Sequence, residues 1–252
     1  MTLLHLTDLT VTRGQCPVVD HVSLDIAAGE CVGLIGPNGA GKTTLMRAAL
    51  GLLPHTGTSS LAQLPPRARA AQAAWLPQSR EIAWPVTVES VVALGRLPHL
   101  ARGSRLRPQD QAAVDAALER MGLAAYRHRL ATELSGGEQA RVLIARTLAQ
   151  GTPLLMADEP IAGLDPAAQI STLQVFADLA GEGHAVLTSL HDLSLAARYC
   201  TRLILLHRGR LHADGAPTDV LTPETLAEVF HLRARVHLTE DGPLFQPLGV
   251  LS

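Results

Sequence analysis

The chain has 252 residues, a length that suits one hydrophobic core with at most a small attached subdomain. Its formal net charge of -2 at pH 7 is too small to attract a polyanion, so no nucleic acid partner is expected. Three widely spaced cysteines without a CxxC pair argue against a disulfide framework and a zinc site. The start lacks the features of a secretory signal and no segment is apolar enough to span a bilayer, so we expect any membrane role to depend on a partner.

The first part of the chain predicts β-strands. In residues 18–26 the apolar side chains lie mostly two positions apart, as in a half-buried strand. Residues 31–35 form a short apolar run that predicts a buried strand, with Cys31 as a small hydrophobe inside it. Residues 45–50 then predict a helix.

The loop between this strand and this helix fits the phosphate-binding pattern of two glycines, a lysine and a hydroxyl residue. It consists of Gly36, Pro37, Asn38, Gly39, Ala40, Gly41, Lys42, Thr43 and Thr44. Glycines let backbone N–H groups point at phosphates, and the following helix offers its positive end. Lys42 adds a charge for the β- and γ-phosphates, and Thr43 offers a hydroxyl to Mg2+. A glycine-rich structural turn is the alternative, which the full pattern between a strand and a helix disfavours.

Residues 86–148 predict a mainly helical region with breaks at Pro98, Gly103 and Pro108, and with an alanine-rich helix over residues 111–121. A cluster of arginines in it is expected to form a solvated surface; these are Arg96, Arg102, Arg105 and Arg107. We expect a nucleotide-binding core of residues 1–85 and 149–225. A hinged helical subdomain of residues 86–148 is inserted into it, and residues 226–252 form a C-terminal extension.

Within the helical region, a second motif precedes its last helix and contains Ser135, Gly136, Gly137 and Glu138. Ser135 with Glu138 three residues later predicts a capping box. Such a helix start, with exposed N–H groups and a serine hydroxyl, also binds anions. The chain therefore has a second candidate surface for phosphates.

A third motif follows the apolar residues 154–157, which predict a buried parallel strand. Asp158 and Glu159 end this strand at the edge where open α/β sheets bind ligands. Because successive strand residues point in different directions, Asp158 is expected to hold Mg2+ and Glu159 to polarise the attacking water. A helix N-cap is the alternative role of such an acidic pair.

Near the end of the chain, residues 234–238 and 243–246 flank Glu240, Asp241 and Gly242, which predicts a hairpin. No catalytic motif is evident there.

The three motifs in this order resemble the ATP-binding subunits of ATP-binding cassette (ABC) transporters over nearly the whole chain. Residues 134–139 match the family's signature. The resemblance implies an α/β fold with a P-loop NTPase core, an inserted helical signature subdomain and a small N-terminal antiparallel β region. It further implies a head-to-tail dimer of two copies, in which the signature of one copy closes on ATP and Mg2+ held by the other.

Further family elements map onto single residues. Gln78 occupies the position of the Q-loop glutamine, which contacts Mg2+ and water and senses the membrane partner. Residues 162–165 match the D-loop and end in Asp165, and His191 matches the switch histidine at the γ-phosphate. The expected catalytic residues are thus Glu159, His191, Gln78 and Lys42, and the expected Mg2+ ligands are Thr43, Gln78 and Asp158.

One position departs from the family. Members usually stack an aromatic residue on adenine near the end of the first strand, and this chain has Arg13 there. Arg13 either stacks its guanidinium plane on the base or is a solvated loop charge.

Residues 92–98 and 190–199 are similar to segments of ATPases that serve importers of iron-siderophore, haem and cobalamin. This implies integral membrane permease subunits, with residues 81–87 as a contact, an indirect substrate-binding protein, and a location at the cytoplasmic face of the cell membrane. Alternatives are a transporter for another metal, an oxyanion or export, and a soluble ABC-type ATPase acting on ribosomes or DNA. A small-molecule kinase shares the phosphate loop but gives no reason for the signature.

Overall fold

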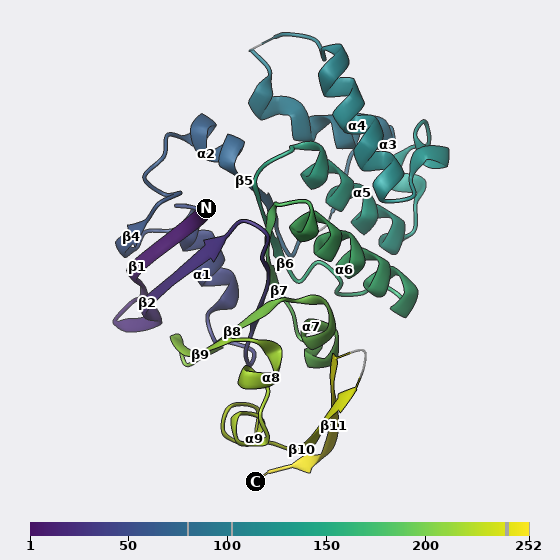
Figure 1. Cartoon of the computed structure of the whole chain (residues 1–252). Helices are drawn as coiled ribbons and strands as arrows, with labels where there is room; N and C mark the ends of the chain where they lie inside the picture. Colours follow the sequence, from purple (N-terminus) through teal and green to yellow (C-terminus); the bar gives the residue numbers. More distant parts are fainter. Residues whose placement is uncertain (80, 102, 240–241, 252) are drawn as a thin grey trace.

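The structure is a computed structural model that describes residues 1–79, 81–101, 103–239 and 242–251. Within these residues a six-stranded sheet has the order β5-β6-β7-β3-β8-β9, with only β9 antiparallel to its neighbour (Figure 1). Every residue of β3, β6 and β7 is buried, as expected for parallel strands covered on both faces. The strands are β3 (Cys31–Ile35), β5 (Ala73–Leu76), β6 (Leu154–Asp158), β7 (Ala185–Ser189), β8 (Arg202–His207) and β9 (Arg210–Gly215).

One face of this sheet packs on helix α1 (Lys42–Ala49) and on an antiparallel sheet with the order β2-β1-β4. The alternation predicted for residues 18–26 is present in β2, where Val22, Leu24 and Ile26 are buried between exposed neighbours. The remaining elements here are β1 (Thr2–Arg13), β2 (Cys16–Ala27), β4 (Thr56–Ser59) and α2 (Pro66–Gln72). This sheet is the N-terminal antiparallel β region that the sequence predicts.

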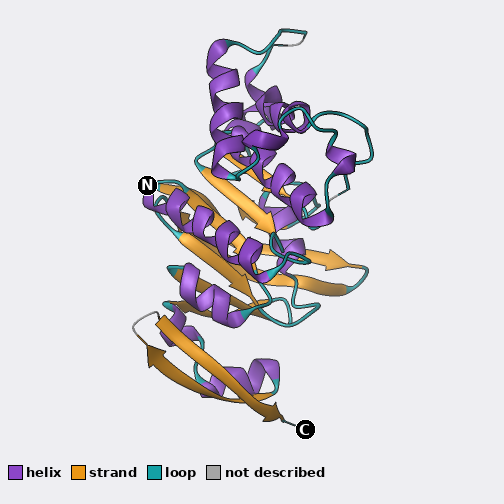
Figure 2. Ribbon diagram, turned by 90° about the vertical axis from the view of Figure 1, so that its right-hand side faces the viewer, coloured by secondary structure: helices purple, strands orange, loops and turns teal. Residues whose placement is uncertain are grey.

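The other face packs on α6 (Pro166–Gly181) and α7 (Leu193–Tyr199), and Phe176 of α6 is fully buried there. Beyond them lies the helical region, at the opposite end of the molecule from the C-terminal hairpin (Figures 1 and 2). Its elements are α3 (Val88–Ala93), η1 (Leu94–His99), α4 (Pro108–Arg120), η2 (Ala124–Tyr126), η3 (Ala131–Glu133) and α5 (Gly136–Ala149), where η denotes a 3-10 helix.

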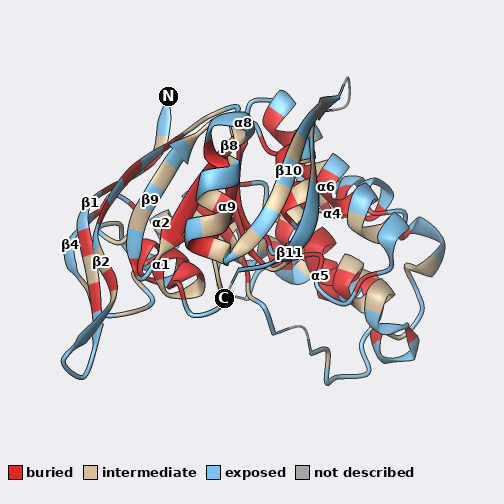
Figure 3. Cartoon of the chain, turned by 90° about the horizontal axis from the view of Figure 1, so that it is seen from below, coloured by how far each residue is buried: buried red, intermediate tan, exposed pale blue. Residues whose placement is uncertain are grey.

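The chain ends in α8 (Pro217–Val220), α9 (Pro223–Phe230) and a hairpin of β10 (Leu232–Thr239) and β11 (Gly242–Val250). The predicted hairpin is confirmed, and Glu240 and Asp241 of its turn lie outside the described residues. Figure 3 shows the buried residues along the central sheet and the helix faces turned toward it, whereas the hairpin is mostly exposed. None of the helices in the described ranges is long and apolar enough to cross a bilayer.

The prediction of a solvated arginine surface is wrong for Arg96, whose side chain is only 11% exposed. Its guanidinium pairs with the fully buried Asp110 and donates to the carbonyls of Ala149 and Gln150, at 2.8 and 3.1 Å. Arg96 therefore caps the C-terminal end of α5, where carbonyl groups lack helical partners. Arg105 and Arg107 are exposed as predicted, and Arg102 lies outside the described residues.

The buried pair makes the stability of the fold depend on Asp110. A hydrogen bond from the Arg107 side chain, followed by bonds from the Arg107 backbone and from Arg96, lowers the pKa of Asp110 from 3.8 to about 2. Because the folded chain lowers this pKa, ionised Asp110 stabilises the fold above pH 4, and the contribution disappears as the pH falls from about 4 to about 2.

We therefore expect Asp110→Asn to lower the melting temperature at pH 7, and the difference from the unsubstituted chain to shrink toward pH 2. The measurement is thermal unfolding of both chains at pH values from 2 to 7. Asp178→Asn on α6 is the matched control, because Asp178 is exposed and bonds only locally to Gln174. A constant difference across the pH range would contradict the assignment.

Gly36 and Gly41 of the phosphate loop each allow a close approach of another backbone segment. A Cβ on Gly36, which has φ 145°, would lie 2.2 Å from the carbonyl oxygen of Leu206 in β8. A Cβ on Gly41, with φ 102°, would lie 2.6 Å from the carbonyl oxygen of Val18. Gly39 also has a positive φ of 80°, but a Cβ there would meet no atom within 4 Å.

This contrast predicts a difference between two alanine variants. Gly39→Ala strains only the backbone, which costs roughly 1–2 kcal/mol for a left-handed residue. Gly36→Ala adds a collision with β8, so its free energy of unfolding should fall further. Urea unfolding of both variants measures this, and equal losses would show that the contact with Leu206 does not constrain the loop.

Candidate active site

The phosphate loop lies between β3 and α1 and opens into a pocket of about 230 Å³. Gly41 is the N-cap of α1 and offers no side chain to its first N–H groups, so these remain available to an anion. The pocket is lined by residues 38–44 together with Arg13, Val18 and Glu159. Arg13 lies at the pocket and its side chain is exposed, which fits both an adenine contact and a solvated loop charge.

Lys42 is buried within this loop and folds back onto it. Its Nζ donates to the carbonyl oxygens of Gly36, at 2.7 Å, and Pro37, at 3.1 Å. Burial lowers the pKa of Lys42, and the nearby carboxylates of Glu159 and Asp158 oppose this effect. A phosphate group in the pocket would offer the ammonium stronger, charged acceptors than these carbonyls.

Asp158 ends β6 and Glu159 follows it, and both contact Ser189, which ends β7 directly opposite Asp158. The Ser189 hydroxyl donates to Asp158 Oδ1 at 2.6 Å and accepts from the Glu159 backbone N–H at 2.8 Å. The sequence alone predicts no role for Ser189. The available signal was a polar residue that ends an apolar strand two positions before His191.

Asp158 is almost fully buried, and its Oδ2 has no hydrogen-bond partner among the described residues. A buried carboxylate oxygen without a partner is costly unless a cation or an ordered water completes it. Together with the Thr43 hydroxyl at the pocket wall, this oxygen fits the oxygen ligands that Mg2+ requires.

Glu159 lies between two other predicted catalytic side chains, Gln78 and His191. Gln78 Nε2 donates to Glu159 Oε2 at 2.9 Å, and His191 Nε2 lies 2.6 Å from Glu159 Oε1. The strand order explains this meeting, because Gln78 follows β5 and His191 follows β7, the two neighbours of β6. Glu159 has a φ of 49°, a left-handed conformation that turns the chain sharply after the strand.

The signature residues form a separate group at the start of α5. Ser135 and Glu138 make the predicted capping box, in which each side chain accepts from the other's backbone N–H. The N–H of Ser135, followed by its hydroxyl, lowers the pKa of Glu138. Gly136 and Gly137 begin the helix, and Asp165 separately caps α6 by accepting from Ala168 N. Among the described residues, none of these lines the phosphate-loop pocket.

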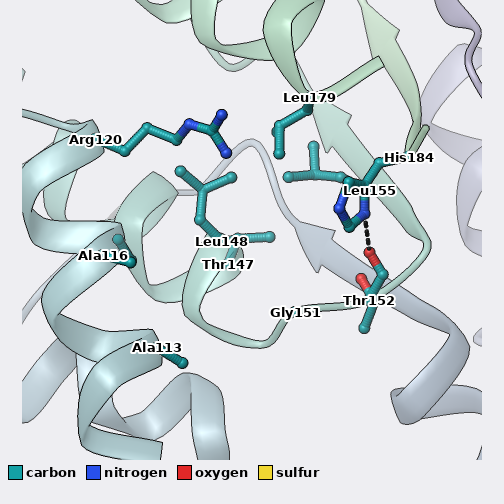
Figure 4. Close-up of a pocket in the computed structure, with 11 residues that line it drawn as sticks. Ala113, Ala116, Arg120, Thr147, Leu148, Gly151, Thr152, Leu155, Leu179 and His184 are labelled. Carbon is teal, nitrogen blue, oxygen red and sulfur yellow. Dashed lines mark hydrogen bonds between the residues drawn. The ribbon is translucent and has the colours of Figure 1, made fainter. Parts of the chain in front are cut away.

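Another pocket, of about 240 Å³, lies between α4, α5 and α6, away from the phosphate loop (Figure 4). Apolar side chains such as Leu148, Leu155 and Leu179 line it, and His184 donates from Nδ1 to the Thr152 carbonyl. Its described lining is mostly apolar, and Arg120 and His184 are its titratable side chains. The phosphate-loop pocket is therefore the candidate active site.

Comparisons with known proteins identify the family of the chain. The model of the ABC transporter family matches residues 19–162, which include the phosphate loop, the signature and the Asp158–Glu159 pair. A hemin import ATP-binding protein of Pseudomonas aeruginosa is 44% identical over 245 residues, covering 93% of this chain and 94% of that protein. A cobalamin import ATP-binding protein of Halobacterium salinarum is 45% identical over 240 residues, covering 92% of this chain. The aligned part spans only 60% of that longer relative.

Two solved structures have the same fold. A chain of an ABC transporter in an inward-facing conformation has a TM-score of 0.86 at 24% identity, covering 99% of this chain and 98% of that one. A dimeric ATP-binding cassette bound to ADP and Pi, in a post-hydrolysis state, has a TM-score of 0.73 at 25% identity and covers 85% and 98%. The predicted fold class is thereby confirmed, and the chain belongs to the ABC transporter family.

Proposed function

We propose that this chain is the ATP-hydrolysing subunit of a membrane importer for a metal chelate such as haem or cobalamin. The observation that carries the ATPase part is the position of Glu159, held by Gln78 and His191 next to a complete phosphate loop. The names of the hemin and cobalamin relatives support the transport part.

In this proposal the γ-phosphate draws the Lys42 ammonium away from the carbonyls of Gly36 and Pro37. Glu159 orients a water in line with the γ-phosphate, and His191 stabilises the charge that develops there. Thr43, Gln78 and Asp158 would hold Mg2+, which would supply positive charge against the phosphates when bound. Ser189 keeps both acids in place, because its hydroxyl bonds to the side chain of one and to the backbone of the other.

We infer that a second copy completes the site, because the signature residues are remote from the phosphate loop of their own chain. Ser135, Gly136, Gly137 and Glu138 would face the ATP of the partner, and Asp165 would lie at the contact between copies. The dimeric cassette with bound ADP and Pi supports this arrangement. Arg13 would lie against the adenine at the pocket wall.

The cargo, partners and location follow from the transport proposal. The chain would bind permease subunits at the cytoplasmic face of the cell membrane, and a substrate-binding protein would deliver the chelate. Residues 81–87 offer an exposed contact for the permease, since Trp84 is 76% exposed. The chain would work as the core of residues 1–85 and 149–225, the helical subdomain of residues 86–148 and the extension of residues 226–252.

The first test is Glu159→Gln, which removes the proposed base while keeping a side chain of similar shape. Losing a positioned base lowers the rate by about 10²–10⁴-fold. We expect this loss in steady-state ATP turnover, together with an ATP-dependent dimer on size-exclusion chromatography. Glu224→Gln, at an exposed position of α9, should leave turnover unchanged. Turnover by Glu159→Gln at the unsubstituted rate would refute the assignment of the base.

The second test concerns Ser189. Ser189→Ala leaves a buried carboxylate oxygen and a backbone N–H without their shared partner, which costs about 1–3 kcal/mol of unfolding free energy. It should also raise the Mg2+ concentration needed for half-maximal turnover, because Asp158 is no longer oriented.

Thr188→Val is the matched control, since Thr188 is equally buried and its hydroxyl has no partner among the described residues. Urea unfolding and turnover at varied Mg2+ measure both effects. An unchanged Mg2+ dependence in Ser189→Ala would mean that Ser189 does not position Asp158.

A further inference from the structure

A second pocket, of about 250 Å³, lies behind the phosphate loop. Residues 37–40 form one wall, and the turn between β8 and β9 and the end of α9 form the other, with His207, Arg208, Val229 and His231. Residues 38–40 also line the proposed ATP pocket. The phosphate loop therefore forms a wall of both pockets.

The walls of this pocket are firmly connected. The Gly209 N–H donates to the Ala40 carbonyl at 3.2 Å, and the Asp20 N–H donates to the Gly209 carbonyl at 2.8 Å. Val229, at the base of α9, is 2% exposed and belongs to the core. The cavity is thus a feature of the packed fold and not a gap between loose segments.

Two of its lining residues occupy backbone positions that favour glycine or asparagine. Arg208, with φ 51°, and Gly209, with φ 79°, are the central residues of the two-residue turn that joins β8 to β9. Such a turn needs positive φ at both positions and prefers Asn-Gly. His231, with φ 53°, ends α9 at a position where glycine is usual. At both places the chain bears strain of about 1–2 kcal/mol to present a basic side chain.

The pocket is electropositive. Arg208 is permanently charged, His207 and His231 can accept protons, and none of the described lining residues is acidic. Burial lowers the pKa of His207, and the nearby Arg208 and His212 lower it further. Glu228 weakly opposes this shift in pKa, and His231 weakly adds to it. Glu228 itself faces His212, at 3.9 Å. The C-terminal end of α9 carries about half a negative charge, which repels an anion. This charge is smaller than the full positive charge of Arg208.

We propose that this pocket binds a phosphate-type oxyanion, held by the Arg208 guanidinium and the imidazoles of His207 and His231. Guanidinium and imidazole N–H groups are strong donors to such anions, and a phosphate offers more acceptor oxygens than a carboxylate to donors from three side chains. The cavity has room for inorganic phosphate with bound waters. The site is distinct from the phosphate loop although it shares residues 38–40 with it.

The test titrates inorganic phosphate into the nucleotide-free full-length chain by calorimetry, with chloride at matched ionic strength as the blank. Every protein carries Lys42→Ala, so that the phosphate loop contributes weakly and equally. Arg208→Asn and His231→Gly each remove one charge-assisted donor, so we expect phosphate affinity to fall about tenfold or more in each. Both should also raise the melting temperature in phosphate-free buffer, because they relieve a strained backbone position.

His21→Gly is the matched control, because His21 has nearly the same φ of 55° and does not line the pocket. It should keep the phosphate affinity of the reference protein. If Arg208→Asn and His231→Gly are more stable but bind phosphate as tightly as the control, the two residues serve only the turn and the helix end, and the proposal is wrong. Absence of phosphate binding in the Lys42→Ala reference would also overturn it.

Discussion

The parallel pairing of β5, β6, β7 and β3 is the constraint on which the candidate site depends. Each of these strands ends at the same edge of the sheet, so the loops that follow them meet there. Gln78, Glu159 and His191 are far apart in the chain, yet they meet because β6 lies between β5 and β7. The phosphate loop follows β3, the other neighbour of β7. A shift of one residue in the register of β6 would point Asp158 away from Ser189 and leave both acids unsupported.

Helix α5, which begins with the signature residues, and strand β5, which precedes Gln78, are joined by hydrogen bonds in addition to apolar packing. Arg96 caps the end of α5, and the Gln150 side chain just beyond it donates to the carbonyls of Ala70 in α2 and of Ala73 at the start of β5. Gln78 follows that strand. Gly95 allows this approach, because a Cβ there would lie 2.1 Å from the Arg146 carbonyl. Hydrogen bonds therefore connect the end of α5 with the start of the strand that precedes Gln78.

Much of the fold could be predicted from sequence because its signals are local. Apolar runs marked β3, β6 and β7, a glycine-rich pattern marked the phosphate loop, and the spacing of Ser135 and Glu138 marked the start of α5. Contacts across strands carry no such signal. The role of Ser189 depends on β7 pairing with β6, and sequence periodicity does not report strand order. The burial of Arg96 could not be predicted for a similar reason. Its partner Asp110 lies on another helix, and clustered arginines are ordinarily exposed to solvent.

Positive φ at residues other than glycine is concentrated around the phosphate loop in the described part of the chain. Five described residues other than glycine have positive φ, and two of them, Asp8 and His21, lie in the irregular outer strands β1 and β2. The other three surround the phosphate loop: Glu159 lines one of its pockets, and Arg208 and His231 line the other. At Glu159 the left-handed turn lets the backbone N–H reach Ser189 while the carboxylate meets Gln78 and His191. Strain of this kind persists only where the surrounding structure enforces it, and here both sides of one loop do so.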